Sequence, residues 1–294
     1  MARRRPPLRL APLLTLLRRH PLLLLLAAVL AVGDYAYEVL YARPAMTWQG
    51  LPAAHNWQPV TWTRVLRNDG FLVGWSDLRG NPLWVQYRLR AIPADAPRLR
   101  RPQRFSRDWR ALNSVGHDDY SGSGYDRGHL APNYAISRLY GAQAQQDTFL
   151  MTNITPQRPN LNQKVWQRLE EVEADVFAPR HGELWVLTGP VFDADIQRLP
   201  GAARVELPDA YFKIYAAPAA GPRDEPLLLA LLVPQTVRGT EPLDQFVTSI
   251  DRVEELTGFD FFPLMSVELQ ARLEAAADPA AWQLEQVARR PGRY

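Results

Sequence analysis

Residues 125–136 read YDRGHLAPNYAI and place one of the chain's five histidines, His129, in a run of charged and turn-forming residues. Gly128 comes directly before it, and glycine allows a backbone to turn sharply. Asp126 is positioned to orient a side chain or a backbone group nearby. A lone histidine of this kind is either a structural residue or a catalytic base, so the surrounding sequence has to separate the two.

Downstream of His129, the stretch TNITPQRPNLNQ (residues 152–163) is rich in side-chain amides. It contains Asn153, Gln157, Asn160, Asn162 and Gln163. Amide oxygens are hard ligands that suit magnesium or calcium rather than zinc. The alternative is helix capping, which is a strong explanation for Asn160 because asparagine caps helix N-termini well.

The next segment, residues 161–178, has apolar residues every three or four positions and is predicted to be a helix. Glu170 lies eight residues after Asn162, which places the two side chains within about 80° of each other around the helix axis. A carboxylate in that position can hold metal-bound water. The alternative is an exposed helix glutamate.

Upstream of His129, residues 98–110 form a local positive patch. Six of these residues are arginines: Arg98, Arg100, Arg101, Arg104, Arg107 and Arg110. The formal net charge of +3 does not reveal this patch, because residues 1–44 carry seven arginines against two acidic residues, which leaves −2 for the rest. The patch indicates either contacts to phosphate groups or a solvated, arginine-rich loop.

The N-terminus predicts a targeting segment. Residues 1–41 combine a basic start with an apolar run at 21–33, which is typical of a secretory signal or a membrane anchor. We expect residues 42–60 to be a linker and residues 61–294 to form a single domain. The domain is therefore expected outside the cytoplasm, as a periplasmic or secreted protein or one anchored in the inner membrane by residues 21–33.

The element order of the domain predicts an α+β fold with a largely antiparallel sheet, because strands and helices do not alternate regularly. The predicted strands are 71–77, 82–89, 147–157, 183–193, 211–218 and 226–235, and a second helix is predicted at 242–258. The chain has no cysteine, which excludes disulfides and thiolate-ligated metals, and its histidines show no zinc-ligand spacing.

Taken together, DRGH followed about 30 residues later by TNITPQ…LNQ..W.RLE resembles the DNA/RNA non-specific endonucleases. The resemblance is strongest over residues 107–171 and extends more loosely over 60–265. It implies a ββα-metal active site on a mixed, largely antiparallel central sheet flanked by helices. The chain departs from the family pattern after GHLAP, where Asn133 and Tyr134 follow.

The resemblance also implies a role for each matching residue. His129 resembles the general base, Asn162 the direct magnesium ligand, and Glu170 the residue that holds metal-bound water. The other implied roles are a phosphate clamp at Arg107, substrate binding at Arg127, Gln157 and Arg168, and support from Asp126 and Asn153. The implied cofactor is Mg²⁺, with Mn²⁺ as the alternative metal.

The sequence therefore predicts a magnesium-dependent endonuclease that hydrolyses DNA and RNA without sequence preference. The alternative is a non-catalytic, membrane-tethered protein that binds nucleic acid through the arginine patch. Homodimers occur in the family that the chain resembles, but no stretch of the sequence marks an interface. Because a nuclease is toxic inside a cell, export or an inhibitor partner is expected, and no inhibitor site is visible in the sequence.

Overall fold

The computed structural model describes residues 20–113, 115–221 and 224–292. By its internal contacts the chain divides into two units, Met1–Ala45 and Met46–Tyr294. The basic start of the predicted leader, residues 1–19, lies outside the described residues.

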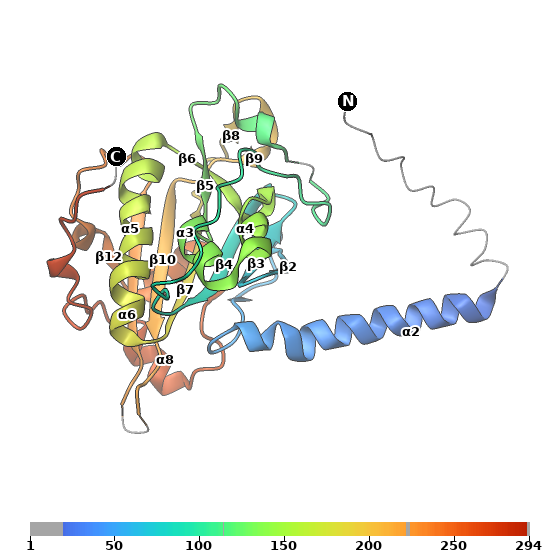
Figure 1. Cartoon of the computed structure of the whole chain (residues 1–294), viewed down its shortest axis with the longest axis horizontal. Helices are drawn as coiled ribbons and strands as arrows, with labels where there is room; N and C mark the ends of the chain where they lie inside the picture. Colours follow the sequence, from blue (N-terminus) through green and yellow to red (C-terminus); the bar gives the residue numbers. More distant parts are fainter. Residues whose placement is uncertain (1–19, 114, 222–223, 293–294) are drawn as a thin grey trace. The chain divides into compact units, whose positions relative to one another are not determined.

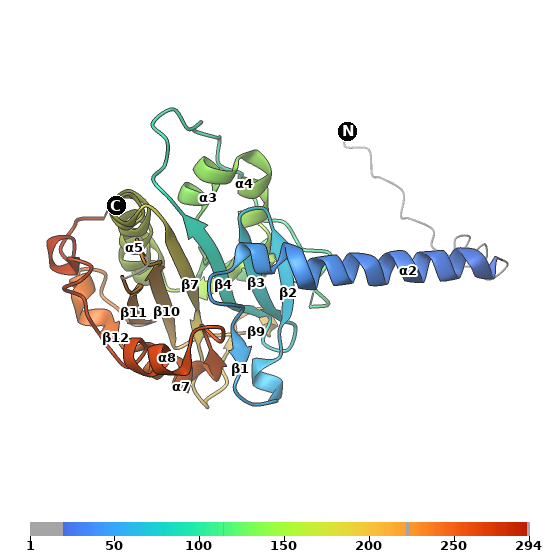
Figure 2. The same ribbon diagram turned by 90° about the horizontal axis from the view of Figure 1, so that it is seen from below.

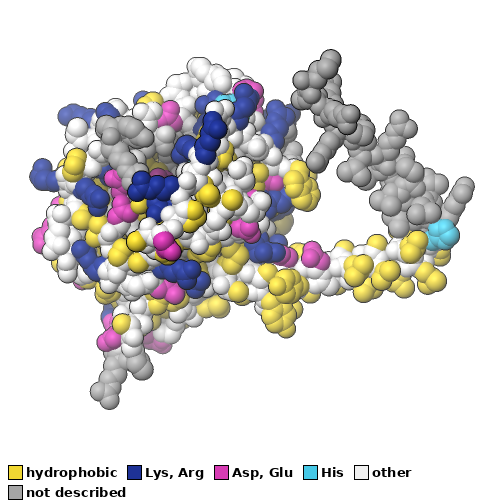
Figure 3. All heavy atoms as spheres, in the orientation of Figure 1, with side chains coloured by type: hydrophobic (Ala, Val, Ile, Leu, Met, Phe, Trp, Pro, Cys, Tyr) yellow, Lys and Arg dark blue, Asp and Glu magenta, His cyan; other side chains and the backbone are white. Residues whose placement is uncertain are grey.

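In the first unit, helix α2 (Pro21–Tyr37) continues into a π-helical segment, Glu38–Ala42, and contains no buried residue. From Pro21 to Met46 the helix has 26 residues and is long and apolar enough to cross a membrane. Figure 3 shows apolar side chains along it. The helix is therefore longer than the apolar run of residues 21–33.

The second unit begins inside the predicted linker of residues 42–60. Met46, Trp48 and Leu51 pack against buried residues of the core, and strand β1 (Ala53–Ala54) pairs with strand β13 (Phe259–Asp260). The structure thus places residues 46–60 in the folded unit.

A seven-stranded sheet forms the centre of this unit, in the order β12-β11-β10-β7-β4-β3-β2 (Figure 1). Its strands are β2 (Arg64–Asn68), β3 (Phe71–Ser76), β4 (Asn81–Leu89), β7 (Leu184–Val191), β10 (Ala210–Ala217), β11 (Leu227–Pro234) and β12 (Val247–Thr248). Each neighbouring pair runs antiparallel. The predicted α+β class with a largely antiparallel sheet is confirmed.

The remaining elements are short strands and helices around this sheet. Two more strand pairs are β5 (Asp126–His129) with β6 (Ile154–Gln157) and β8 (Arg198–Leu199) with β9 (Ala202–Glu206). The other helices are α3 (Asn133–Tyr140), α4 (Ala142–Thr148), α5 (Gln167–Val172), α6 (Ala178–His181), α7 (Ile250–Thr257) and α8 (Val267–Leu273). Short 3-10 turns lie at 44–46, 59–61, 117–120, 151–153, 243–246 and 284–286.

Successive strand residues point to opposite sides, so both faces of the sheet carry apolar side chains. Helices cover both faces. In β10, Tyr211 and Tyr215 join the core on one face, whereas Phe212 and Ile214 join the core on the other. Figure 2 shows α3, α4 and α5 on one side of the sheet and α7 and α8 on the other.

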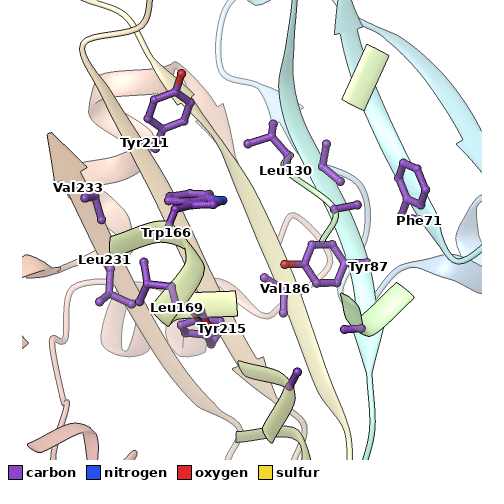
Figure 4. Close-up of a cluster of buried hydrophobic side chains, with 14 of the residues drawn as sticks. Phe71, Tyr87, Leu130, Trp166, Leu169, Val186, Tyr211, Tyr215, Leu231 and Val233 are labelled. Carbon is purple, nitrogen blue, oxygen red and sulfur yellow. Dashed lines mark hydrogen bonds between the residues drawn. The ribbon is translucent and has the colours of Figure 1, made fainter. Parts of the chain in front are cut away.

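One continuous helix crosses the first face and positions the candidate site. It runs through π-helical segments at Leu161–Trp166 and Glu173–Phe177 and through α5 and α6, and we call it the site helix (residues 161–181). Figure 4 shows Trp166 and Leu169 directed at the tyrosines of β10, and the rings of Trp166 and Tyr211 meet edge to face at 5.6 Å. This packing anchors the predicted helix, which ends at His181 rather than at the predicted Ala178.

Two predicted elements are shorter than expected. The apolar run of residues 147–157 begins as the end of α4 and a 3-10 turn, and only Ile154–Gln157 is strand. An apolar run alone does not separate a buried strand from a buried helix. The helix predicted at 242–258 begins at Ile250, because Oγ of Ser249 caps it by accepting a hydrogen bond from Arg252 N, and it ends at left-handed Gly258.

Candidate active site

A polar pocket of about 720 Å³ opens on the face of the sheet that the site helix covers. Residues from the 98–101 loop, β5, α3 and the site helix line it: Arg98, Leu99, Arg101, Arg127, His129, Asn133, Tyr134, Ser137, Arg138, Asn162, Gln163, Gln167 and Glu170. This lining combines four arginines with one carboxylate, so the pocket favours an anion. Figure 3 shows Lys and Arg side chains at several places on the face drawn there.

Strands β5 and β6 hold the histidine at the pocket. They pair antiparallel, with Asp126 opposite Gln157 and His129 opposite Ile154. Gly128 lies within β5, so the sharp turn predicted there is wrong. Its lack of a side chain serves close packing instead, since a Cβ at this position would overlap Oε1 of Gln157.

His129 is 8% exposed and sits among aromatic rings. The rings of Phe105 and Phe149 lie 5.2 Å and 5.0 Å from its ring, and its carbonyl oxygen accepts a hydrogen bond from Trp166 Nε1 at 3.1 Å. Nε2 has no hydrogen-bond partner in the described part of the chain. Burial, assisted by the charge of Arg101, lowers the pKa of His129 to about 3, so the imidazole is neutral and able to accept a proton.

Asp126 fixes the amide of Asn162. Its Oδ2 accepts hydrogen bonds from Asn162 Nδ2 at 3.0 Å and from Gln163 Nε2 at 2.7 Å. Because the amide nitrogen of Asn162 faces Asp126, the amide oxygen, Oδ1, is left for another partner. A neutral oxygen held in this way is a suitable ligand for a hard divalent cation.

Glu170 lines the same pocket as Asn162, two turns further along the site helix. Burial raises the pKa of Glu170 to about 8, and the neighbouring Glu173 and Glu171 add to the increase, although Lys213 and Arg101 oppose it. A divalent cation nearby would favour the charged form of this carboxyl group.

A buried ion pair acts electrostatically on Glu170: Lys213 lowers the pKa of this carboxyl group, and Glu173 raises it. Lys213 and Glu173 are fully buried, and Lys213 Nζ lies 2.7 Å from Oε2 of Glu173. Tyr87 completes the network by donating a hydrogen bond to Oε1 of Glu173 at 2.7 Å. Neither residue of this ion pair is apparent as a site residue in the sequence, because β10 and the site helix meet only in the folded chain.

Asn153, which is predicted to support the site, lies on the 3-10 turn at 151–153, and Gln157, which is predicted to bind substrate, lies on β6. Both side chains are buried. Asn153 accepts a hydrogen bond from Ala131 N and donates to the carbonyl oxygens of Ala131 and Thr148, at 2.9–3.0 Å. It therefore ties the loop after β5 to the end of α4. The side chain of Gln157 is fully buried against Gly128, and both its polar atoms lack hydrogen-bond partners within the described residues.

The three predicted arginines lie in different surroundings. Arg127 lines the pocket, and its guanidinium donates to the carbonyl oxygen of His117 at 2.9 Å and 2.7 Å. Arg107 is exposed, packs against Gly116 and is not part of the pocket lining. Arg168 also lies outside the lining; it is 5% exposed and donates to the carbonyl oxygen of Glu241 at 2.6 Å.

The pocket also contains residues that the motifs do not single out. Arg101 belongs to the predicted positive patch and stacks over the Phe149 ring at 5.0 Å. Tyr134, Ser137 and Arg138 come from α3. Their spacing of three to four residues places them on one helix face. Polar residues at this spacing directly after GHLAP are the sequence pattern that could have predicted them as site residues.

The comparisons with known proteins agree with this fold. The family model described as DNA/RNA non-specific endonuclease matches residues 58–268. Human mitochondrial endonuclease G is 32% identical over 193 residues, covering 62% of this chain and 63% of that protein. A nuclease of Serratia marcescens is 29% identical over 207 residues, covering 65% and 72%.

A solved structure has a similar fold. The crystal structure of the EndoG/EndoGI complex matches with a TM-score of 0.59 and 21% identity, covering 69% of this chain and 86% of the other. Because the family model covers most of the folded unit, the chain belongs to the DNA/RNA non-specific endonuclease family. The chain spans 63% of human endonuclease G and 53% of the bovine protein.

Proposed function

We propose that this protein is a divalent-metal-dependent endonuclease that hydrolyses phosphodiester bonds of DNA and RNA without sequence preference. The observation that carries the proposal is the convergence of His129, Asn162 and Glu170 in one arginine-lined pocket. The family membership supports the same activity.

The donor set suits a single Mg²⁺ or Mn²⁺ ion. Oδ1 of Asn162 would be the direct ligand, and Glu170 would hold water of the metal's hydration shell. Mg²⁺ retains several waters and needs few protein ligands when phosphate supplies others. When bound, the cation would stabilise the negative charge that develops on the phosphate and on the leaving oxygen.

The chain's own residues perform the proton transfer and the positioning. Nε2 of His129 accepts a proton from the attacking water, whose oxygen forms the new bond to phosphorus while the bond to the 3′-oxygen breaks. The leaving 3′-oxygen takes a proton from a water molecule, so the products carry a 5′-phosphate and a 3′-hydroxyl group. Substrate phosphates near the imidazole raise its pKa from the low value of the free protein, which increases its strength as a base.

The arginines bind the backbone of the nucleic acid. Arg101 and Arg127 lie at the pocket and contact phosphate, and exposed Arg107 contacts a phosphate further along the strand. Contacts to phosphate carry no direct sequence information, so the site accepts many sequences. Gln157 and Arg168, both buried, support the walls of the site rather than the substrate directly.

The N-terminal helix supports a location outside the cytoplasm. We propose that the helix of residues 21–46 is a signal or an inner-membrane anchor and that the folded unit is periplasmic or secreted. In the related EndoG/EndoGI complex, EndoG is inhibited by its partner, and we propose an inhibitor protein or a homodimer as a partner of this chain as well.

The direct test is degradation of plasmid DNA and of RNA by the purified protein, with Mg²⁺ and with EDTA. We expect cleavage that stops in EDTA, and we expect His129→Ala to fold normally but to lose cleavage. Full activity of His129→Ala would contradict the general-base role. Salt-sensitive binding without any cleavage by the unaltered protein would favour the alternative, a non-catalytic, membrane-tethered binding protein.

A further inference from the structure

A second group of carboxylates lies on the opposite face of the sheet from the pocket. Asp251 and Glu254 belong to α7, and Glu274 follows the end of α8. One carboxylate oxygen from each residue lies within 4.8 Å of those of the other two. The backbone holds the helices together here, because Ile250 N and Asp251 N donate to the carbonyl oxygen of Glu274 at 2.9 Å and 3.2 Å. Figure 2 shows α7 and α8 on this side of the sheet.

Glu274, a member of this group, has an unsatisfied carboxylate oxygen. The residue is 4% exposed, and its Oε1 has no hydrogen-bond partner in the part of the chain that the structure describes. A buried carboxylate oxygen without a partner is costly. Glu254 is more completely bonded: Oε1 accepts from Phe261 N at 2.9 Å, and Oε2 lies 4.0 Å from Nε2 of His55.

Nearby arginines do not neutralise the group. Arg252 pairs with Glu255, and Arg272 pairs with Glu225 at 2.5 Å. Among the described residues, the His55 contact is the one ion pair that involves any of the three carboxylates.

Burial, and to a lesser extent the neighbouring carboxylates, disfavour the charged forms of Glu274 and Glu254. Burial, followed by the charges of Glu254, Asp260 and Asp251, raises the pKa of Glu274 to about 8. Burial also raises the pKa of Glu254 to about 7, and Asp260 and Asp251 add to the increase.

We propose that Asp251, Glu254 and Glu274 bind a Ca²⁺ ion, separate from the catalytic metal, which fastens α7 to the end of α8. Ca²⁺ binds six to eight oxygens at about 2.3–2.6 Å, so oxygens on opposite sides of the ion lie about 5 Å apart. The three carboxylate oxygens already fit within that span. Mg²⁺ demands a strict octahedron at about 2.0–2.1 Å and dehydrates reluctantly, so three carboxylates contributed by two separate helices favour Ca²⁺. Exposed Asp251 leaves room for water ligands.

The bound ion would stabilise the layer of helices that covers this face of the sheet. Leu269 and Leu273 of α8 and Val253 of α7 pack against the core on this face. A cation that joins the two helices therefore stabilises the folded state over the unfolded chain, where the three carboxylates are not held together. This site acts on stability and does not depend on the proposed nuclease activity.

The test is thermal unfolding of the full chain in EGTA and in CaCl₂. At a hundredfold excess of Ca²⁺ over its dissociation constant, we expect the Tm to rise by about 5 °C or more. The same rise is expected in Glu268→Gln, a control that removes an exposed carboxylate from α8, and in Asn162→Ala, which removes the catalytic ligand.

Glu274→Gln should abolish this response while its Tm in EGTA is unchanged or higher, because the neutral amide keeps the side chain's shape and cannot carry the charge that burial and the neighbouring carboxylates disfavour. Asp251→Asn, at an exposed position, should weaken the response. The proposal is overturned by an absent Ca²⁺ response in the unaltered protein, by a full response in Glu274→Gln, or by loss of the response in Asn162→Ala. A Mg²⁺ response equal to that of Ca²⁺ would overturn the choice of ion.

Discussion

Asn162 donates a hydrogen bond from Nδ2 to Oδ2 of Asp126 at 3.0 Å, and the two residues are 36 positions apart in the chain. The bond joins the start of β5 to the first turn of the site helix. It fixes which end of the amide faces the protein, and therefore which end remains for a ligand. Asp126 also accepts a hydrogen bond from Gln163, so one carboxylate orients two neighbouring amides.

The first prediction concerns this bond. In Asp126→Ala the amide of Asn162 is free to rotate, and we expect the Mg²⁺ concentration for half-maximal cleavage to rise by about 10- to 100-fold. Titration of plasmid cleavage with Mg²⁺ measures the effect, with Asp95→Ala, an exposed loop position, as the control. Asn162→Ala should raise the requirement at least as strongly. An unchanged requirement in both variants would place the metal ligand elsewhere.

The second prediction concerns His129 and pH. Its pKa falls from 6.5 to about 3 on folding. As pH falls, the imidazole therefore binds a proton in the unfolded chain at a higher pH than in the folded chain. Its contribution to stability is therefore full above pH 6.5 and is lost as pH falls towards 3.

Between pH 6.5 and pH 5, His129 should account for a loss of about 1.5 kcal/mol in the free energy of unfolding. Urea unfolding at both pH values measures this loss, with His129→Asn as the comparison, because asparagine does not titrate. Equal losses in the two proteins would show that the imidazole is not held neutral by burial.

The third prediction concerns phosphate contacts. If Arg101 neutralises one phosphate of bound duplex DNA, Arg101→Ala should reduce the slope of log K against log salt by about 0.9. Binding in EDTA, which prevents cleavage, isolates this effect. Arg272→Ala is the matched control, because Arg272 is exposed and pairs with Glu225. A slope unchanged by Arg101→Ala would remove this arginine from the binding surface.

The fourth prediction concerns the buried ion pair of Lys213 and Glu173. Lys213→Met leaves Glu173 buried without its cation, and loss of one partner of such a pair costs about 3–5 kcal/mol of stability. Urea unfolding measures the cost. The double variant Lys213→Met/Glu173→Leu removes both charges and should recover a large part of it. A double variant as unstable as the single one would show that the pair itself, rather than the orphaned charge, stabilises the protein.

Much of the fold follows from local patterns. Strands β3, β4, β7, β10 and β11 lie where apolar runs predict them, and the site helix begins at the predicted Leu161. The errors fall where local pattern is ambiguous. Residues 147–153 are apolar enough for a strand but form the end of α4 and a turn, because Asn153 bonds the carbonyl oxygen of Thr148 and holds the chain there.

The site follows from sequence only in part. The order and spacing of the motifs predict His129, Asn162 and Glu170 as site residues, and all three line one pocket in the structure. The surroundings of Arg168 and Gln157 are not readable in the same way, because burial of a polar side chain depends on what packs over it. Arg168 meets Glu241, which is 73 residues further along the chain.

Periodicity and motif order along the chain are enough to specify the residue types and spacings of the site, the leader's apolar segment and the class of the fold. The environment of each group depends instead on folding. The low pKa of His129, the orientation of Asn162 and the carboxylate group of α7 and α8 all arise from contacts between segments distant in sequence. Desolvation and charge act through space, and only the folded chain sets those distances.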